Sequence, residues 1–347
     1  MSRYFQPHIE RMAGYVPGEQ PHEGGFIKLN TNENPYPPSP LIAEAIAAAL
    51  GEQLRLYPDP LGTTFREAAG RRHRVDPEMI LAGNGSDDLL TIVTRAFVGP
   101  GDCVVYPTPS YILYRTLIEL QDGRGVEVPY SPDWMLDPDA FAHPGPRLAY
   151  LANPNSPSGT ALAPEAVGAL AERLDCPLVV DEAYADFAED DCVGLVSDHP
   201  NLIVTRSFSK GYSLAGLRLG YLIARPEVVA GLIKVKDSYN CDTLSLVGGA
   251  AALGDQAHLA RTRAKILATR RRLTDALRDL GYYVPESQAN FVWCVGGPPA
   301  APIYLALKER KILVRLMHYP GLPDGLRITV GTDAEIDALL EALRALA

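Results

Sequence analysis

Short apolar segments alternate with amphipathic, helix-like segments from residue 40 to about residue 225. The strand candidates, each bounded by Pro, Gly, Asn or Asp, are residues 103–106, 125–128, 148–151, 178–180, 202–205 and 219–223. Helix candidates among them include residues 40–50 and 87–97, whose apolar side chains recur at helical spacing. This alternation predicts an α/β fold with a mainly parallel sheet that is covered by helices on both faces.

The pattern changes after residue 225. A long helix is expected over residues 256–280, and a last helix is expected from residue 333 to the end. Short strands are expected at residues 291–294, 312–315 and 326–330. We therefore predict an N-terminal arm (1–30) that joins the smaller domain, a large α/β domain (31–245) and a small α+β domain (246–347).

The charge balance and the cysteines restrict the partners and the compartment. The net charge of -10 argues against nucleic acid and anionic membranes, which need a basic surface. The five cysteines contain no C-x-x-C pair, which is typical of reduced thiols in a cytoplasmic protein. No signal peptide or span of 18 apolar residues is visible, so we expect a soluble, non-exported protein. The seven histidines have no ligand spacing, and no metal site is expected.

One lysine stands close to hydroxyl residues and an arginine. Lys210 follows the hydroxyl residues Ser207 and Ser209, and Arg218 lies eight residues further on. These residues suit pyridoxal 5'-phosphate, because the lysine can carry the cofactor aldehyde as a Schiff base, while the hydroxyls and the arginine can bind the phosphate. A lone lysine would usually be a solvated surface residue, but this spacing favours the cofactor site.

An acid follows the strand candidate 178–180. Asp181 can hold the pyridine nitrogen protonated, and Tyr184 can reach the phenolic oxygen of the ring. The alternative for Asp181 is an ordinary turn residue at a strand end. Because Asp181 and residues 207–210 both follow strand candidates, we expect them at the same edge of the sheet.

A glycine-containing turn at residues 83–88 precedes a helix candidate. Gly85, Ser86 and Asp87 would place backbone N–H groups at the positive end of that helix, which suits a phosphate. Alternatively, Ser86 is only the N-cap of the helix. The turn is not G-x-G-x-x-G, which argues against a dinucleotide enzyme.

Two further segments offer a ring and an amide to a flat cofactor. Tyr111 follows a strand candidate and can stack on the cofactor, or it is simply a core or surface tyrosine. The turn-rich segment 153–159 contains Asn155, whose amide can bind a cofactor oxygen or merely form an Asx turn.

Together these motifs carry a family resemblance that covers nearly the whole chain. The chain resembles the fold-type I pyridoxal phosphate-dependent aminotransferases and, within them, the histidinol-phosphate aminotransferases. The matching segments are residues 14–18, 29–35, 57–59, 83–88, 181–184, 207–218, 313–315, 320–322 and 326–332.

The resemblance implies a role for each matching residue around the cofactor. Lys210 would form the covalent link, Asp181 would pair with the ring nitrogen and Tyr184 would bind the ring oxygen. Tyr57 would reach the phosphate in the neighbouring subunit, so a homodimer is implied. The other cofactor residues would be Gly85, Ser86, Asp87, Tyr111, Asn155, Ser207, Ser209 and Arg218.

The substrate side follows from the same resemblance. Arg327 would hold the acidic end of the substrate, with Arg315 assisting, Tyr15 covering it and Asn34 nearby. An exposed strand position is the alternative for either arginine. Members of the family commonly have asparagine where this chain has Ser156, so either Asn155 or Ser156 would contact the ring oxygen.

The implied reaction is ping-pong amino transfer. L-Histidinol phosphate and 2-oxoglutarate would give imidazole acetol phosphate and L-glutamate, a step of histidine biosynthesis. An aminotransferase for aromatic amino acids or other phosphorylated amines is the first alternative, and a lyase similar to threonine-phosphate decarboxylase is the second. A cofactor-binding regulator without turnover is the third.

Overall fold

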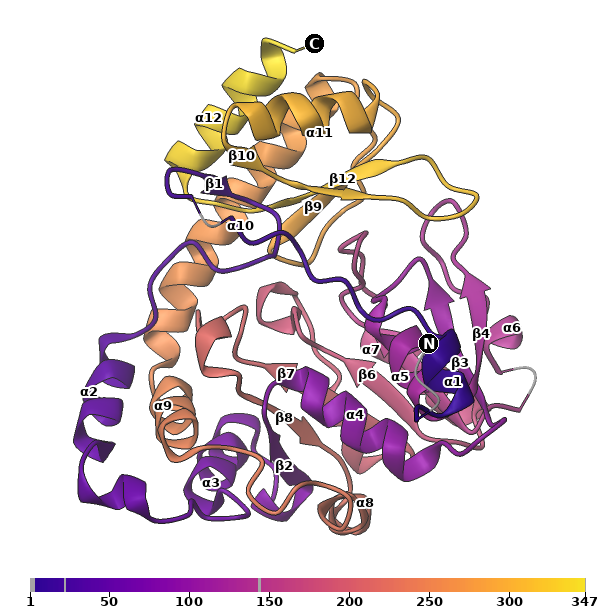
Figure 1. Cartoon of the computed structure of the whole chain (residues 1–347), viewed down its shortest axis with the longest axis vertical. Helices are drawn as coiled ribbons and strands as arrows, with labels where there is room; N and C mark the ends of the chain where they lie inside the picture. The colour runs from indigo at the N-terminus through magenta and orange to yellow at the C-terminus, as the bar shows by residue number, and fades with distance from the viewer. Residues whose placement is uncertain (1–3, 22, 143–144, 347) are drawn as a thin grey trace.

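The computed structural model describes residues 4–21, 23–142 and 145–346. Residues 1–3 and 22 of the expected N-terminal arm lie outside the described residues, as do His143 and the last residue of the small-domain prediction, 347. The chain forms a large lower body around one sheet and a smaller upper body, and the long helix α10 (Gln256–Asp279) runs between them (Figure 1).

Seven strands form the central sheet. In spatial order they are β2 (Ile80–Gly83), β8 (Gly220–Ile223), β7 (Leu202–Ser207), β6 (Leu178–Asp181), β5 (Leu148–Ala152), β3 (Cys103–Thr108) and β4 (Arg124–Pro129). Strands β3 to β7 are parallel, and β8 is antiparallel to both β7 and β2. The mainly parallel sheet and its six predicted strands are confirmed. Strand β2 was not predicted, because its sequence Ile-Leu-Ala-Gly has one β-branched residue and only its pairing with β8 makes it a strand.

Helices cover both faces of this sheet, as the alternation predicts. Along β6, Val180 packs in the core on one face and Val179 in the core on the other, because successive side chains of a strand point in opposite directions. One core contains side chains of α2 (Pro40–Ala49), α3 (Thr63–His73), α7 (Pro164–Arg173) and α9 (Thr243–Gly254). The other contains side chains of α4 (Ser86–Phe97), α5 (Leu113–Leu120) and α8 (Pro226–Ile233).

The upper body contains a small antiparallel sheet in the order β11 (Arg315–Met317), β12 (Gly325–Thr329), β9 (Phe291–Cys294). Its helices are α10, α11 (Ala300–Glu309) and α12 (Asp333–Arg344), which begins with a capping box formed by Thr332 and Glu335. The single strand expected at residues 312–315 is two strands, because β10 (Ile312–Leu313) leaves this region to pair with β1 (Ile27–Lys28).

The short helices α1 (Pro7–Arg11) and α6 (Pro138–Ala142) complete the α-helices of the described residues. The domain boundaries at residues 30/31 and 245/246 stay a proposal. Helix α9 spans the second boundary and packs against α2 and α3 of the lower body. No helix in the described ranges is long and apolar enough to cross a membrane.

Candidate functional site

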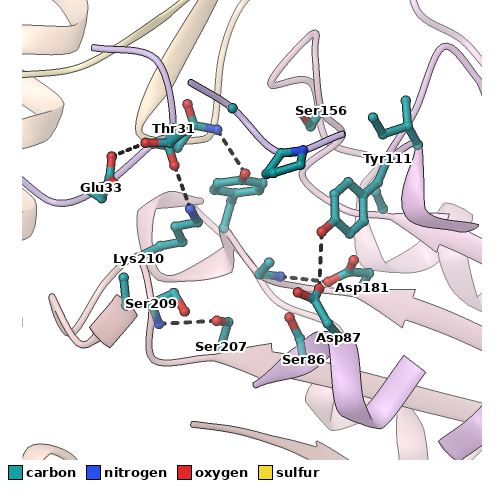
Figure 2. Close-up of a pocket in the computed structure, with 18 of the residues that line it drawn as sticks. Thr31, Glu33, Ser86, Asp87, Tyr111, Ser156, Asp181, Ser207, Ser209 and Lys210 are labelled. Atoms are coloured by element: carbon teal, nitrogen blue, oxygen red, sulfur yellow. Dashed lines mark hydrogen bonds between the residues drawn. The ribbon is translucent and has the colours of Figure 1, made fainter. Parts of the chain in front are cut away.

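A cavity of about 300 Å³ lies where the carboxyl ends of the parallel strands face the N-terminal segment and the small sheet (Figure 2). Twelve of the predicted site residues line it, although they come from segments far apart in the chain. They are Tyr15, Ser86, Asp87, Tyr111, Asp181, Tyr184, Ser207, Ser209, Lys210, Arg218, Arg315 and Arg327. Asp181 ends β6 directly beside Thr205 of β7, so the acid and the 207–210 segment do meet at one edge of the sheet.

The Lys210 amine projects into this cavity from the turn that follows β7. Its Nζ donates a hydrogen bond to the Thr31 carbonyl at 2.9 Å. Burial and the positive charge of Arg327 lower the pKa of Lys210 to about 8, although the carboxylate of Glu33 favours the charged form. A much larger fraction of this amine is therefore neutral and nucleophilic near pH 7 than for an ordinary lysine.

Asp181 presents a buried carboxylate to the cavity. Oδ2 accepts a hydrogen bond from the Tyr114 hydroxyl at 2.9 Å, and Oδ1 accepts one from the Thr205 hydroxyl at 3.3 Å. Burial raises the pKa of Asp181 to about 6. Among the described residues, no basic side chain forms an ion pair with it, so a cationic nitrogen in the cavity would supply the partner that the chain does not.

A buried ion-pair network holds the ends of β6 and β7 together. The Arg206 guanidinium donates to Glu182 Oε2 at 2.9 Å and to Asp186 Oδ1 at 2.7 Å. Glu182 follows Asp181 directly, and Arg206 precedes Ser207, so the network couples the acid and the lysine turn. These side chains lie outside the cavity lining and act on the site only through the backbone.

The N-terminus of α4 forms an anion cup with Arg218. Arg218 Nη1 donates to the Ser209 hydroxyl at 3.3 Å, and Nη2 lies 3.5 Å from Asp87 Oδ2. Gly85 has a φ of +87°, a conformation that strains other residues, so glycine is favoured there, and its Cα lies close to the Arg218 guanidinium. Ser86 and Ser207 complete a set of donors that fits a phosphate group.

Two tyrosines border the same cavity. Tyr111 donates from its hydroxyl to Asp87 Oδ1 at 3.1 Å, and its ring meets that of Tyr15 edge to face at 6.3 Å. Burial raises the pKa of Tyr111 well above its usual value, so the phenol stays neutral. The ring is therefore held firmly at the cavity wall.

Arg315 and Arg327 are direct cross-strand partners in β11 and β12, on the same face of the small sheet. Arg327 donates to the Ser156 hydroxyl at 2.9 Å and to the Asn30 carbonyl at 3.2 Å, and its buried Nε has no hydrogen-bond partner. Within the described part of the chain, neither guanidinium pairs with a carboxylate. Because two like charges side by side repel each other, this arrangement favours an anion between or above them.

Four predicted residues are placed outside the lining. Gly85 lies next to the Arg218 guanidinium, and Asn34 Nδ2 donates to the backbone carbonyls of Lys210 and Gly211 at 3.1 Å each. The Asn155 amide donates to the Pro109 carbonyl and the Ser158 hydroxyl, whereas Ser156 borders the cavity.

Tyr57 is 81 % exposed and its ring stacks on that of Tyr239 at 4.5 Å. It lies away from the cavity of its own chain, and its assignment to a neighbouring subunit stays a prediction.

Sequence reasoning missed several residues that touch or support the site: Thr31, Asn32, Glu33, Tyr114 and Thr205. Thr31, Asn32 and Glu33 stand in the matching segment 29–35, which is a signal in the sequence. No comparable signal marks Tyr114 or Thr205, which reach Asp181 through contacts between distant segments.

Comparisons with known proteins agree with this geometry. Residues 25–343 match the family described as aminotransferase class I and II. The chain is 50% identical over 340 residues to a histidinol-phosphate aminotransferase of Rhodopirellula baltica, covering 97% of this chain and 94% of that protein. It is 47% identical to histidinol-phosphate aminotransferase 1 of Trichormus variabilis, covering 99% of each. The crystal structure of histidinol-phosphate aminotransferase from Sinorhizobium meliloti in complex with pyridoxal-5'-phosphate superposes with a TM-score of 0.90, at 30% identity, covering 100% of this chain and 99% of that one.

Proposed function

The chain belongs to the aminotransferase class I and II family, and we propose that it exchanges amino groups between L-histidinol phosphate and 2-oxoglutarate with pyridoxal 5'-phosphate. The observation that carries the substrate class is the paired guanidinium groups of Arg315 and Arg327, which have no carboxylate partner in the described residues and share the cavity with Lys210. The relatives named above support the choice of the phosphorylated amine.

The residues present fit the cofactor. The close approach of Gly85 to Arg218 leaves a donor-lined cup for the phosphate, and the unpaired Asp181 carboxylate matches a protonated ring nitrogen. When bound, pyridoxal 5'-phosphate supplies an electron sink for the bonding pair of the substrate carbon. Tyr111 would lie against the ring, and Tyr184 would contact its oxygen.

Lys210 would act twice. Its neutral Nζ would hold the cofactor covalently through the aldehyde carbon. When it is not holding the cofactor, the same Nζ would accept the proton from the amine-bearing carbon of the substrate and keep it for return when the keto acid is converted to the amine. A pKa of about 8 suits both roles, because the amine can give and take a proton near neutral pH.

The guanidinium groups explain how one cavity can serve two unlike substrates. Histidinol phosphate carries a phosphate, whereas glutamate carries carboxylates, and the planar fork of arginine can bind either group through two hydrogen bonds. Because the first product would leave, with its amino group retained, before the second substrate enters the same anion site, the kinetics would be ping-pong.

Replacing Arg327 with lysine tests the substrate assignment. The variant keeps the positive charge but loses the planar guanidinium that can donate two hydrogen bonds to one anion. The value of kcat/KM should therefore fall about 10- to 100-fold for histidinol phosphate and for 2-oxoglutarate alike, as expected for the loss of one charged hydrogen bond. Steady-state rates of both half-reactions measure this. Arg310→Lys, at the end of α11 and outside the cavity, should change neither rate.

The same assay separates the alternatives. The proposal fails if the wild-type protein has no activity with histidinol phosphate. Faster turnover of tyrosine or phenylalanine would favour the aromatic aminotransferase, and release of carbon dioxide from threonine phosphate would favour the lyase.

We further propose a homodimer in which Tyr57 binds the cofactor phosphate of the neighbouring subunit. Support comes from Leu50, Leu54 and Leu56, which expose large apolar side chains close to Tyr57 in the sequence. Tyr57→Phe should weaken cofactor retention about tenfold, because one hydrogen bond to a charged group is lost. Equilibrium dialysis together with sedimentation analysis checks this, and a fully active monomer would contradict it.

A cytoplasmic location is also our proposal, and the five free cysteines support it. Fractionation of cells followed by detection of the chain tests the location, and recovery in a secreted or membrane fraction would contradict it.

A further inference from the structure

Asn32 is a buried asparagine of the N-terminal segment that joins three parts of the chain. Its Nδ2 donates to the Tyr184 hydroxyl at 2.9 Å, and its backbone N–H donates to Thr329 Oγ1 at 3.0 Å. Its backbone carbonyl accepts from Asn290 Nδ2 at 2.9 Å. The residue has a φ of +57°, a conformation that asparagine tolerates better than most side chains.

The hydrogen bonds of Thr329 determine which way the Asn32 amide points. Thr329 Oγ1 accepts from the Asn32 backbone N–H, and its own hydrogen goes to Asn32 Oδ1 at 3.1 Å. If the amide were reversed, the Thr329 hydroxyl would lose this acceptor and would have no other acceptor in the described structure. Because Thr329 is buried, an unsatisfied hydroxyl there would be costly, so Oδ1 faces Thr329 and Nδ2 faces Tyr184.

This orientation constrains the Tyr184 hydroxyl. An amide nitrogen only donates, so Tyr184 must accept from Asn32 and its own hydrogen must go elsewhere. Tyr184 lines the cavity, and the described residues offer its hydroxyl no second partner. The remaining direction for the hydrogen is the cavity itself, where Lys210 and Asp181 also converge (Figure 2).

We propose that Asn32 is a positioning residue that makes Tyr184 a hydrogen-bond donor toward the anionic ring oxygen of the bound cofactor. The inference rests on the proposed function, which places that oxygen near Tyr184. In this chain the Asn155 amide donates to the Pro109 carbonyl and the Ser158 hydroxyl, and the Ser156 hydroxyl accepts from Arg327. The amide that orients Tyr184 is therefore that of Asn32.

The pH titration of the visible absorbance of the cofactor-loaded protein tests this. A donor to the ring oxygen stabilises the anionic form, so it lowers the pKa of the cofactor–lysine link. Tyr184→Phe should raise that pKa by about one unit or more. Asn32→Asp should raise it equally, because a carboxylate only accepts and would take the Tyr184 hydrogen.

Further variants keep the test decisive. Asn32→Gly removes the amide while tolerating the positive φ, and Thr329→Val removes the hydroxyl that orients the amide, so each should give a smaller rise. The double variant Tyr184→Phe/Asn32→Asp should match Tyr184→Phe. Asn30→Ala is the matched control, because Asn30 is buried in the same segment but donates to the Glu19 carbonyl, and it should leave the pKa of the link unchanged.

The outcomes separate the two proposals. If Tyr184→Phe shifts the pKa but none of the Asn32 and Thr329 variants does, the inference about Asn32 is overturned and the proposed function stands. An equal shift in Asn30→Ala would also overturn it. If Tyr184→Phe itself leaves the titration unchanged, the role of Tyr184 in the proposed function fails.

Discussion

Lys210→Ala is expected to abolish both the visible absorbance of the covalent cofactor link and the turnover. The variant removes the amine that binds the aldehyde and the base that moves the substrate proton. Loss of the proton transfer alone should cost about 10²- to 10⁴-fold in rate, and loss of the covalent site should add to this. Absorbance spectra and single-turnover rates measure the effect.

The matched control is Lys308→Ala, which removes an exposed lysine that pairs with Glu19 on the surface. It should retain the absorbance and the rate. Retention of either property in Lys210→Ala would refute the role of Lys210.

The pH dependence of cofactor uptake gives the same prediction an independent check. Because the pKa of Lys210 is lowered to about 8, the neutral amine increases as the pH rises and is nearly complete above that value. The rate of cofactor uptake by the wild-type apoprotein should therefore rise with pH and level off above about pH 8. An increase that continues toward the usual lysine value of 10.5 would contradict the lowered pKa.

Asp181→Asn is expected to reduce kcat by about 10²- to 10⁴-fold. The substitution keeps the size of the side chain but removes the negative charge opposite the ring nitrogen, and breaking a buried ion pair costs about 3–5 kcal/mol. Steady-state kinetics with saturating cofactor measures the loss. Asp181→Glu keeps the charge and should recover part of the rate.

Although Asp181→Asn should lower kcat, it should not lower the thermal stability of the protein without the cofactor. A carboxyl whose folded pKa is raised from 3.8 to about 6 destabilises the fold once the pH exceeds its unfolded pKa, because the charge is then forced into a buried site. At pH 7 the variant without the cofactor should therefore melt at the same temperature as the wild type or higher. A marked drop in melting temperature would mean that Asp181 has a structural role instead.

The strands of the central sheet show which elements can be predicted from the local sequence pattern. Strands β5, β6 and β7 are buried on both faces, so each is a short apolar run that ends at a turn residue and is visible in the sequence. Strand β2 has the same burial but too little β-branched character, and its existence depends on β8. The break between β10 and β11 likewise depends on β1, which lies almost three hundred residues earlier in the chain.

The residues of the candidate site also fall into two groups, those that local motifs predict and those whose contacts depend on the folded chain. Asp181 and Lys210 are predicted from their local motifs, and the rule that the ends of adjacent parallel strands meet places both at one edge of the sheet, where β6 and β7 end. The pairing of Arg315 with Arg327 depends on the register of β11 and β12, which no local pattern specifies. The contacts of Asn32 with Tyr184 and Thr329 depend on three segments that meet only in the folded chain.

The amino-acid sequence by itself determined the α/β alternation, the lysine and acid at the strand ends and the donors of the anion cup, because each depends on residues within one strand, turn or helix start. Only the tertiary structure decided the pKa of Lys210, the unpaired state of Asp181 and the direction of the Tyr184 hydroxyl. These properties come from burial and from charges and hydrogen bonds between distant segments, and such contacts exist only once the chain has folded.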